Sequence, residues 1–284
     1  MKIVKARYTG FCFGVKRAVD KANEALKKYS DEDIYMLGEI IHNPQIIMKY
    51  REEGMKIVEN IYQVPSDKKL ITRAHGMSKQ EKEDAQKRDI KLIDTTCPYV
   101  KKIHLLANAL VKEKYKLAVY GNPNHPEIKS LLSYFADDVL VFQTKKEINP
   151  DIFSKNKRIG LISQTTQELK KYTDIAKKIL MHVDELKVFN TICKATSLRQ
   201  NSTLELAKDV DLLIVVGGKN SANTKRLFCL SKESGIKVYH IESEEELNKK
   251  WFIGKERIGI SSGASTPDCI TEKVINKIKD ISKK

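Results

Sequence analysis

The chain has 284 residues, 41% of them hydrophobic, so it can bury a substantial core in one to three lobes. It has no apolar run of about 18 residues and begins without the charged and apolar blocks of a signal peptide, so we expect a cytoplasmic protein without a membrane span. The net charge of +15 comes mainly from scattered lysines. This is typical of a solvated surface, and it also suits an anionic substrate, an acidic electron-donor protein or, less well, a nucleic acid.

Three segments of the chain repeat one order of elements. In each, a strand ends at a cysteine, a helix with apolar residues at helical spacing follows, and two further strands end in polar turns. The first segment is expected to have strands at 2–8, 34–37 and 70–72, with helices at 15–28 and after Pro44. The second has strands at 92–93, 116–120 and 158–162 and a helix at 100–114; the third has strands within 187–193 and at 211–216 and 257–260, a helix at 197–208 and a helical tail.

The three cysteines that open these segments, Cys12, Cys97 and Cys193, lie 85 and 96 residues apart. From each cysteine to the glycine of the next turn is 26, 24 and 24 residues. Alternating strands and helices predict parallel sheets, whose ligands gather at the carboxyl ends of the strands. The third segment lacks a following cysteine strand, so the N-terminal strand is expected to close its sheet.

This repeat predicts an α/β fold of three lobes related by a pseudo-threefold axis, with mainly parallel sheets and the three cysteines converging on the axis. The lobes are expected at residues 14–96, at 97–192, and at 193–284 together with the N-terminal strand 1–13.

Three cysteines from three lobes predict a metal site with three thiolate ligands. The chain has no Cys-x-x-Cys pair of the kind found in structural zinc sites. A four-iron cluster held by three cysteines would leave one iron open to substrate. The alternatives are a zinc ion with a histidine as fourth ligand, or three inert cysteines in the core.

Of the other residues, Cys229 is expected to be buried and inert, His104 to pack, and His182 and His240 to be peripheral.

The remaining strand ends carry a polar set that suits a small anion such as phosphate, because imidazoles, hydroxyls, an amide and helix N-termini all bind phosphate oxygens. Glu127, two residues after His125, is either a proton donor or a first-turn carboxylate that stabilises the helix dipole. The set comprises His42, His75, His125, Glu127, Gln164, Thr165, Thr166, Ser221, Asn223 and Ser265.

Eight motifs, in order along nearly the whole chain, resemble the LytB/IspH family of 4-hydroxy-3-methylbut-2-enyl diphosphate reductases. They are Phe11-Cys12-Phe13-Gly14-Val15, Ala74-His75-Gly76, Thr96-Cys97-Pro98, His125-Pro126-Glu127, Gln164-Thr165-Thr166, Ile192-Cys193, Lys219-Asn220-Ser221 and Gly263-Ala264-Ser265-Thr266-Pro267-Asp268.

The resemblance implies three lobes around a [4Fe-4S] cluster that is held by Cys12, Cys97 and Cys193 and has one iron without a cysteine ligand. That iron would bind the hydroxyl of an allylic diphosphate, and two electrons and two protons would remove it as water. The products would be isopentenyl and dimethylallyl diphosphate, at the last step of the non-mevalonate isoprenoid route. The implied catalytic residues are Glu127, Thr165 and His125, and the implied substrate-binding residues are His42, His75, His125, Thr165, Thr166, Ser221, Ala222, Asn223 and Ser265, with Ala222 where many members have a second serine.

The sequence does not identify the electron donor, but a ferredoxin or flavodoxin would suit the basic surface electrostatically. We expect a monomer with neither a nucleic-acid nor a membrane partner. Two alternatives remain at this point. An enzyme similar to quinolinate synthase would also use three cysteines and a cluster, but it would bind dicarboxylates. A basic nucleic-acid-binding protein would show steeply salt-dependent affinity and contain no iron.

Overall fold

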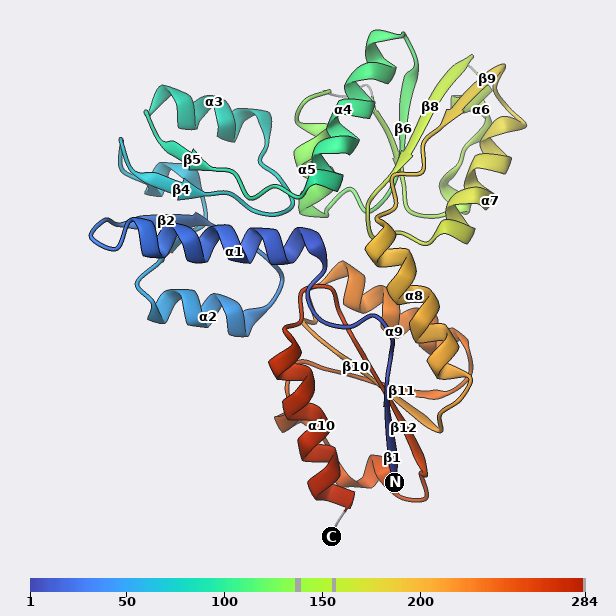
Figure 1. Ribbon diagram of the computed structural model, residues 1–284. Coiled ribbons are helices and arrows are strands. Elements are labelled where there is room, and N and C mark those ends of the chain that lie inside the picture. The colour runs from blue at the N-terminus through green and yellow to red at the C-terminus, as the bar shows by residue number, and fades with distance from the viewer. Residues whose placement is uncertain (136–138, 155–156, 283–284) are drawn as a thin grey trace. The chain divides into compact units, whose positions relative to one another are not determined.

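Three four-stranded sheets, each entirely parallel, form the framework of this α/β protein (Figure 1). The structure is a computed structural model and describes residues 1–135, 139–154 and 157–282. The chain divides into two compact units. The first unit comprises Met1–Lys16, Ile41–Lys49 and Lys194–Lys284 and contains one sheet; the second comprises Arg17–Ile40 and Tyr50–Cys193 and contains the other two.

The sheet of the first unit joins the two ends of the chain. Its order is β1-β12-β10-β11, and β1 runs parallel to β12, as the dark blue and red strands in Figure 1 show. The prediction that the N-terminal strand closes the third sheet is therefore confirmed. The elements of this sheet and its helices are β1 (Lys2–Lys5), α8 (Lys194–Ala207), β10 (Leu212–Val216), α9 (Ala222–Glu233), β11 (Lys237–Ile241), β12 (Arg257–Ser262) and α10 (Asp268–Ser282), with short 3₁₀ helices at Glu244–Glu246 and Lys249–Phe252.

The two sheets of the second unit have the orders β3-β2-β4-β5 and β7-β6-β8-β9. The chain segment that forms the first of these contains α1 (Phe13–Lys28), β2 (Ile34–Leu37), α2 (Pro44–Glu52), β3 (Lys56–Val58), β4 (Lys69–Ile71), α3 (Lys79–Lys87) and β5 (Lys91–Ile93), with a 3₁₀ helix at Ile61–Gln63. Residues 13–16 of α1 and 44–49 of α2 belong to the first unit. The second sheet is accompanied by α4 (Pro98–Lys112), β6 (Lys116–Tyr120), α5 (Pro126–Leu132), β7 (Val139–Phe142), α6 (Pro150–Ser154), β8 (Arg158–Ser163), α7 (Leu169–Leu180) and β9 (Glu185–Val188), with a 3₁₀ helix at Lys145–Glu147.

The three sheets share one connectivity, so the repeat predicted from cysteine spacing is confirmed at the level of strand order. In each sheet the strand that follows the first helix (β2, β6 or β10) pairs with an edge strand on one side (β3, β7 or β11) and with a third strand on the other (β4, β8 or β12). The strand that leads to a cysteine (β5, β9 or β1) pairs with the opposite side of that third strand. The same backbone bond recurs at the glycine turns: Gly38, Gly121 and Gly217 donate to the ends of the edge strands over 2.7, 2.9 and 2.8 Å.

The edge strands β3, β7 and β11 are among the elements that the sequence analysis missed, together with α3, α6 and α7. An edge strand is covered on fewer sides than a central one, so its apolar pattern is weaker. β11 has one fully buried residue, Ile241, whereas all five residues of the central strand β10 are buried. Continuous burial on both faces is typical of central strands in parallel sheets and gives the apolar runs that were recognised. None of the helices in the described parts of the chain combines the length and apolar character needed to cross a membrane.

Candidate active site

Each of the three repeat cysteines is fixed to the turn that follows the neighbouring strand. The N–H group of Cys97 donates to the carbonyl of Ala74 over 2.9 Å, and that of Cys193 donates to Thr165 over 2.9 Å. In the first unit, the N–H group of Cys12 donates to Ala264 over 3.1 Å. The acceptors lie in the turns that carry His75, Thr165 and Ser265, so each cysteine is held beside a turn predicted to bind substrate.

The three cysteines form no disulfide and are partly exposed, and at least two of them meet a helix N-terminus. Cys97 is the N-cap residue of α4 and is followed by Pro98 in the first turn, as predicted. The Cys12 sulfur accepts a hydrogen bond from the N–H group of Val15 over 3.4 Å. Unused N–H groups at a helix N-terminus favour a negative charge, so these positions suit thiolate ligands.

Glu127 is a buried acid of the second unit. It lies in the first turn of α5 and is 2% exposed. The Thr165 N–H group donates to Oε1 over 2.7 Å, and the Thr165 hydroxyl donates to Oε2 over 2.6 Å. Burial raises the pKa of Glu127 to about 7 even though both hydrogen bonds act to lower it. A carboxyl group with a pKa near neutrality can both hold and release a proton under ordinary conditions.

His125 and His75 extend this polar region. The Glu127 N–H group donates to Nδ1 of His125 over 3.2 Å, so in the neutral ring the proton resides on Nε2. The two imidazoles pack edge to face, with ring centroids 5.4 Å apart and an interplanar angle of 86°. His125 therefore has a defined orientation and tautomer, which a residue that donates a hydrogen bond to a ligand requires.

In the first unit, the turn that carries His42 is held against two other turns. The Ser265 hydroxyl donates to the His42 carbonyl over 3.1 Å, and the Asn43 side chain donates to the Ser265 carbonyl over 2.9 Å. Gly218 lies so close that a Cβ atom there would be 2.6 Å from the His42 carbonyl oxygen. Any side chain at Gly218 would therefore displace the His42 turn.

Asn223 provides the clearest sign of a ligand in the first unit. Its side chain is 5% exposed, and neither amide atom has a hydrogen-bond partner among the described residues. An unmet buried amide costs on the order of 1–3 kcal/mol, which a bound ligand would recover. Ser221, the N-cap residue of α9, accepts a bond from the Thr224 N–H group over 3.3 Å and keeps its hydroxyl proton available. A helix N-terminus with these groups suits an anion.

The predicted site residues fall into two sets. The first unit contains Cys12, His42, Ser221, Ala222, Asn223 and Ser265, and the second contains Cys97, Cys193, His75, His125, Glu127, Thr165 and Thr166. Within the second unit, the Thr166 hydroxyl accepts a bond from the Gln164 amide over 3.0 Å. Convergence of all three cysteines on one centre, and the lobe boundaries, stay predictions.

Two residues outside this set differ from expectation, and a third was not singled out from the sequence. Cys229 is exposed rather than buried. His240 is half-buried and lies 2.8 Å, through Nε2, from the carbonyl of Gly217, so it supports a turn that the sequence analysis placed in the site. Arg199 is 5% exposed and donates to the carbonyl of Gly10 over 2.6 Å, two residues before Cys12. An arginine among the small polar residues of α8 was the only signal of that role in the sequence.

Comparisons with known proteins agree with these observations. The family model described as LytB protein matches residues 3–279. The chain is 43% identical over 282 residues to the 4-hydroxy-3-methylbut-2-enyl diphosphate reductase of Aquifex aeolicus (strain VF5), which covers 98% of this chain and 96% of that protein. It is also 43% identical over 281 residues to the enzyme of that name from Campylobacter jejuni subsp. jejuni serotype O:23/36 (strain 81-176), with 99% of each chain covered.

Two solved structures are similar over nearly the whole chain. One is a structure of (E)-4-hydroxy-3-methyl-but-2-enyl diphosphate reductase, the terminal enzyme of the non-mevalonate pathway, with 42% identity, a TM-score of 0.72 and coverage of 98% of this chain and 99% of that one. The other is the E-1-hydroxy-2-methyl-but-2-enyl-4-diphosphate reductase from Plasmodium falciparum, with 29% identity, a TM-score of 0.90 and coverage of 97% and 87%. Both similarities agree with the α/β fold predicted from the repeat.

Proposed function

Because the chain belongs to the LytB family, we propose that it reduces 4-hydroxy-3-methylbut-2-enyl diphosphate to isopentenyl and dimethylallyl diphosphate, the last step of the non-mevalonate isoprenoid route. The observation that carries this proposal is the bonding of Thr165. Its side chain and N–H group hold the Glu127 carboxyl, and its carbonyl accepts the N–H group of Cys193. One residue therefore joins an acid that can deliver a proton to a cysteine suited to bind metal.

The cofactor of this proposal is a [4Fe-4S] cluster held by Cys12, Cys97 and Cys193. The residues present fit it, because none of the three cysteines is in a disulfide and all are partly exposed and fixed by their backbone N–H groups. Three thiolates without a Cys-x-x-Cys pair suit a cluster with one open iron better than they suit structural zinc. When bound, the cluster would supply electrons and a Lewis-acid position for the substrate hydroxyl.

The protein's own residues would bind the substrate and move protons. The unpartnered amide of Asn223, the Ser221 hydroxyl and the α9 N-terminus would hold diphosphate oxygens, with Ala222 contributing its N–H group. His42, Ser265, His75, His125 and Thr166 would complete the anion site.

Protonated Glu127 would pass its proton from Oε2 to the Thr165 hydroxyl oxygen, 2.6 Å away, while that hydroxyl gives its own proton to the substrate. His125, held by its Nδ1 bond to the Glu127 backbone, would donate from Nε2. Two electrons and two protons would then balance the loss of the hydroxyl group as water.

The electron donor would be an acidic protein such as a ferredoxin or flavodoxin, because the net charge of +15 attracts a negatively charged partner. We further propose a cytoplasmic monomer whose function needs neither nucleic acid nor membrane.

The proposal is tested with protein purified without oxygen, in which iron, sulfide, visible absorbance and conversion of the diphosphate are measured with a chemical reductant. Wild-type protein should contain iron and sulfide and form both products. Cys97→Ser should lose activity and most of the absorbance of thiolate-bound iron. The control is Cys229→Ser, which changes an exposed cysteine outside the proposed site and should retain both properties. Iron-free wild-type protein after anaerobic reconstitution, or equal effects of the two variants, would refute the proposal.

A further inference from the structure

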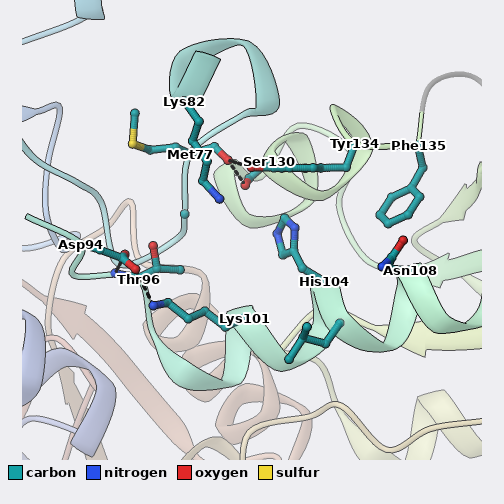
Figure 2. A pocket seen from close by; sticks show the side chains of 12 residues that line it. Met77, Lys82, Asp94, Thr96, Lys101, His104, Asn108, Ser130, Tyr134 and Phe135 are labelled. Atoms are coloured by element: carbon teal, nitrogen blue, oxygen red, sulfur yellow. Dashed lines mark hydrogen bonds and ion pairs between the residues drawn. The ribbon is translucent and has the colours of Figure 1, made fainter. Parts of the chain in front are cut away.

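A cavity of about 530 Å³ opens in the second unit, and none of its lining residues belongs to the proposed active site. Its walls come from α3, from α4, from the end of α5 and from the turns after β4 and β5 (Figure 2). This volume falls within the range of about 300–1,000 Å³ that small-molecule sites occupy. The side chains that line the cavity determine which ligand it would bind.

One end of the cavity is aromatic. The rings of His104 and Tyr134 pack edge to face, with centroids 5.1 Å apart and an interplanar angle of 88°. The Lys82 ammonium group lies 5.2 Å from the centroid of the Tyr134 ring. Figure 2 shows Lys82 and His104 pointing into the same space from α3 and α4, with Phe135 farther along the wall. A flat apolar group would find ring surfaces here, next to a cation.

The charges of the cavity are unevenly paired. At the other end, Lys101 forms an ion pair with Asp94. Burial opposes ionisation of Asp94, but hydrogen bonds from Lys101 and Thr96 lower its pKa to about 2, so this pair is charged and internally neutralised. Lys82, by contrast, forms no ion pair with a described residue. The net positive charge of the cavity therefore lies at its aromatic end.

His104 adds unused hydrogen-bonding capacity at that end. Burial, together with the charge of Lys82, lowers its pKa to about 4, so the ring is neutral at physiological pH. Neither ring nitrogen bonds to another residue in the described parts of the chain. The neutral ring can donate one hydrogen bond, and an anion placed between it and Lys82 would also favour its protonation.

We propose that this cavity is a second binding site, for a small organic anion with a flat apolar body. The carboxylate or phosphate group would lie between Lys82 and His104, and the apolar body would pack on Tyr134 and Phe135. A cation without a carboxylate partner that lies next to a ring surface gains most from a ligand that supplies both a counter-charge and an apolar face.

The position of the cavity connects it to the proposed active site. Gly76 follows His75, Thr96 precedes Cys97, and both line the cavity. Ser130, also in the lining, belongs to α5 and donates to the carbonyl of Met77 over 2.7 Å. A bound ligand would contact the turns that carry His75 and Cys97. An effect on turnover rests on the proposed function, whereas binding itself does not.

The test uses phenyl phosphate as the probe and full-length protein labelled with ¹³C in the histidine rings, and His104→Gln identifies the His104 signal. Because His104 lines the cavity, its signal reports on ligand bound there rather than at the proposed substrate site. Phenyl phosphate should shift the His104 signal saturably and raise the midpoint of its pH titration. Lys82→Ala should weaken this binding about tenfold or more.

The matched control is Lys79→Ala, three residues earlier on α3, where the lysine is exposed and 4.0 Å from Glu83. It should bind phenyl phosphate like the wild type. Tyr134→Leu should weaken phenyl phosphate but leave the affinity for inorganic phosphate unchanged. No saturable His104 shift, equal binding by the two lysine variants, or equal affinity for phenyl phosphate and inorganic phosphate would overturn the proposal. Because iron content and basal turnover are measured on the same samples, a failure here is distinguishable from a failure of the proposed function.

Discussion

Glu127→Gln tests the physical basis of the proposed proton donor. Gln has nearly the shape of Glu, its oxygen can still accept from the Thr165 N–H group, and its amide can donate to the Thr165 hydroxyl. The substitution therefore removes the ability to ionise while keeping both contacts. In wild-type protein, burial raises the pKa of this carboxyl from 4.5 to about 7.

This shift has a defined effect on stability. The folded protein binds the proton more tightly than the unfolded chain, so the stabilisation is fully present below the unfolded pKa and is lost as the pH rises through the folded pKa. A shift from 4.5 to about 7 corresponds to about 3 kcal/mol, because each pKa unit is worth about 1.4 kcal/mol. Between about pH 5 and about pH 8 the wild type should lose about 2 to 3 kcal/mol relative to Glu127→Gln.

Urea unfolding at several pH values, followed by circular dichroism under anaerobic conditions, measures this difference. Glu83→Gln, which alters a surface carboxylate 4.0 Å from Lys79, provides the control and should differ from the wild type by a nearly constant amount. Glu127→Gln should also lose turnover at every pH, because its amide cannot deliver a proton. A stability difference between Glu127→Gln and wild type that does not change with pH would refute the reasoning.

Two further predictions concern residues around the cysteine and diphosphate sites. Arg199→Lys keeps the positive charge but loses the planar guanidinium that donates to the carbonyl of Gly10, two residues before Cys12. The variant should therefore lose iron to a chelator several-fold faster than the wild type, at unchanged helix content. Equal rates of iron loss in the two proteins would contradict this role. Asn223→Ala should bind the diphosphate substrate about tenfold or more weakly, since a hydrogen-bonding group is lost. The variant should nevertheless be at least as stable as the wild type, because the deleted amide has no partner within the described structure. The KM measures the loss of substrate binding, and thermal unfolding measures the stability. A marked loss of stability would argue for a structural role of Asn223.

The central strands were the most predictable part of the fold. The predicted strands at 34–37 and 116–120 coincide with β2 and β6, because strands buried on both faces read as continuous apolar runs. Closure of a sheet by β1 was predictable too, since the third segment lacked a strand that the other two have. The edge strand β3 has three residues and one buried side chain, which leaves too little pattern to recognise.

The candidate site was predictable as a set of residues but not as an arrangement. The position of Glu127 in the first turn of a helix was compatible with a dipole-stabilising carboxylate on the surface or with a buried acid. Its burial and its bonds to Thr165 depend on a contact between residues 38 positions apart. The support that His240 gives to the Gly217 turn is likewise a contact across two strands. Such contacts are set by tertiary packing, which local sequence patterns do not encode.

The repeated scaffold explains how a symmetric strand order can hold an asymmetric site. In all three repeats a cysteine N–H group bonds to the turn after the neighbouring strand, and the acceptors are Ala74, Thr165 and Ala264. These bonds are made by the backbone, so they place the cysteines alike whatever the side chain at the acceptor position. Only the acceptor in the second unit's β8 turn, Thr165, has a hydroxyl, and it bonds Glu127. The proposed proton relay through Thr165 would therefore belong to one repeat, because the equivalent positions in the other two repeats are alanines.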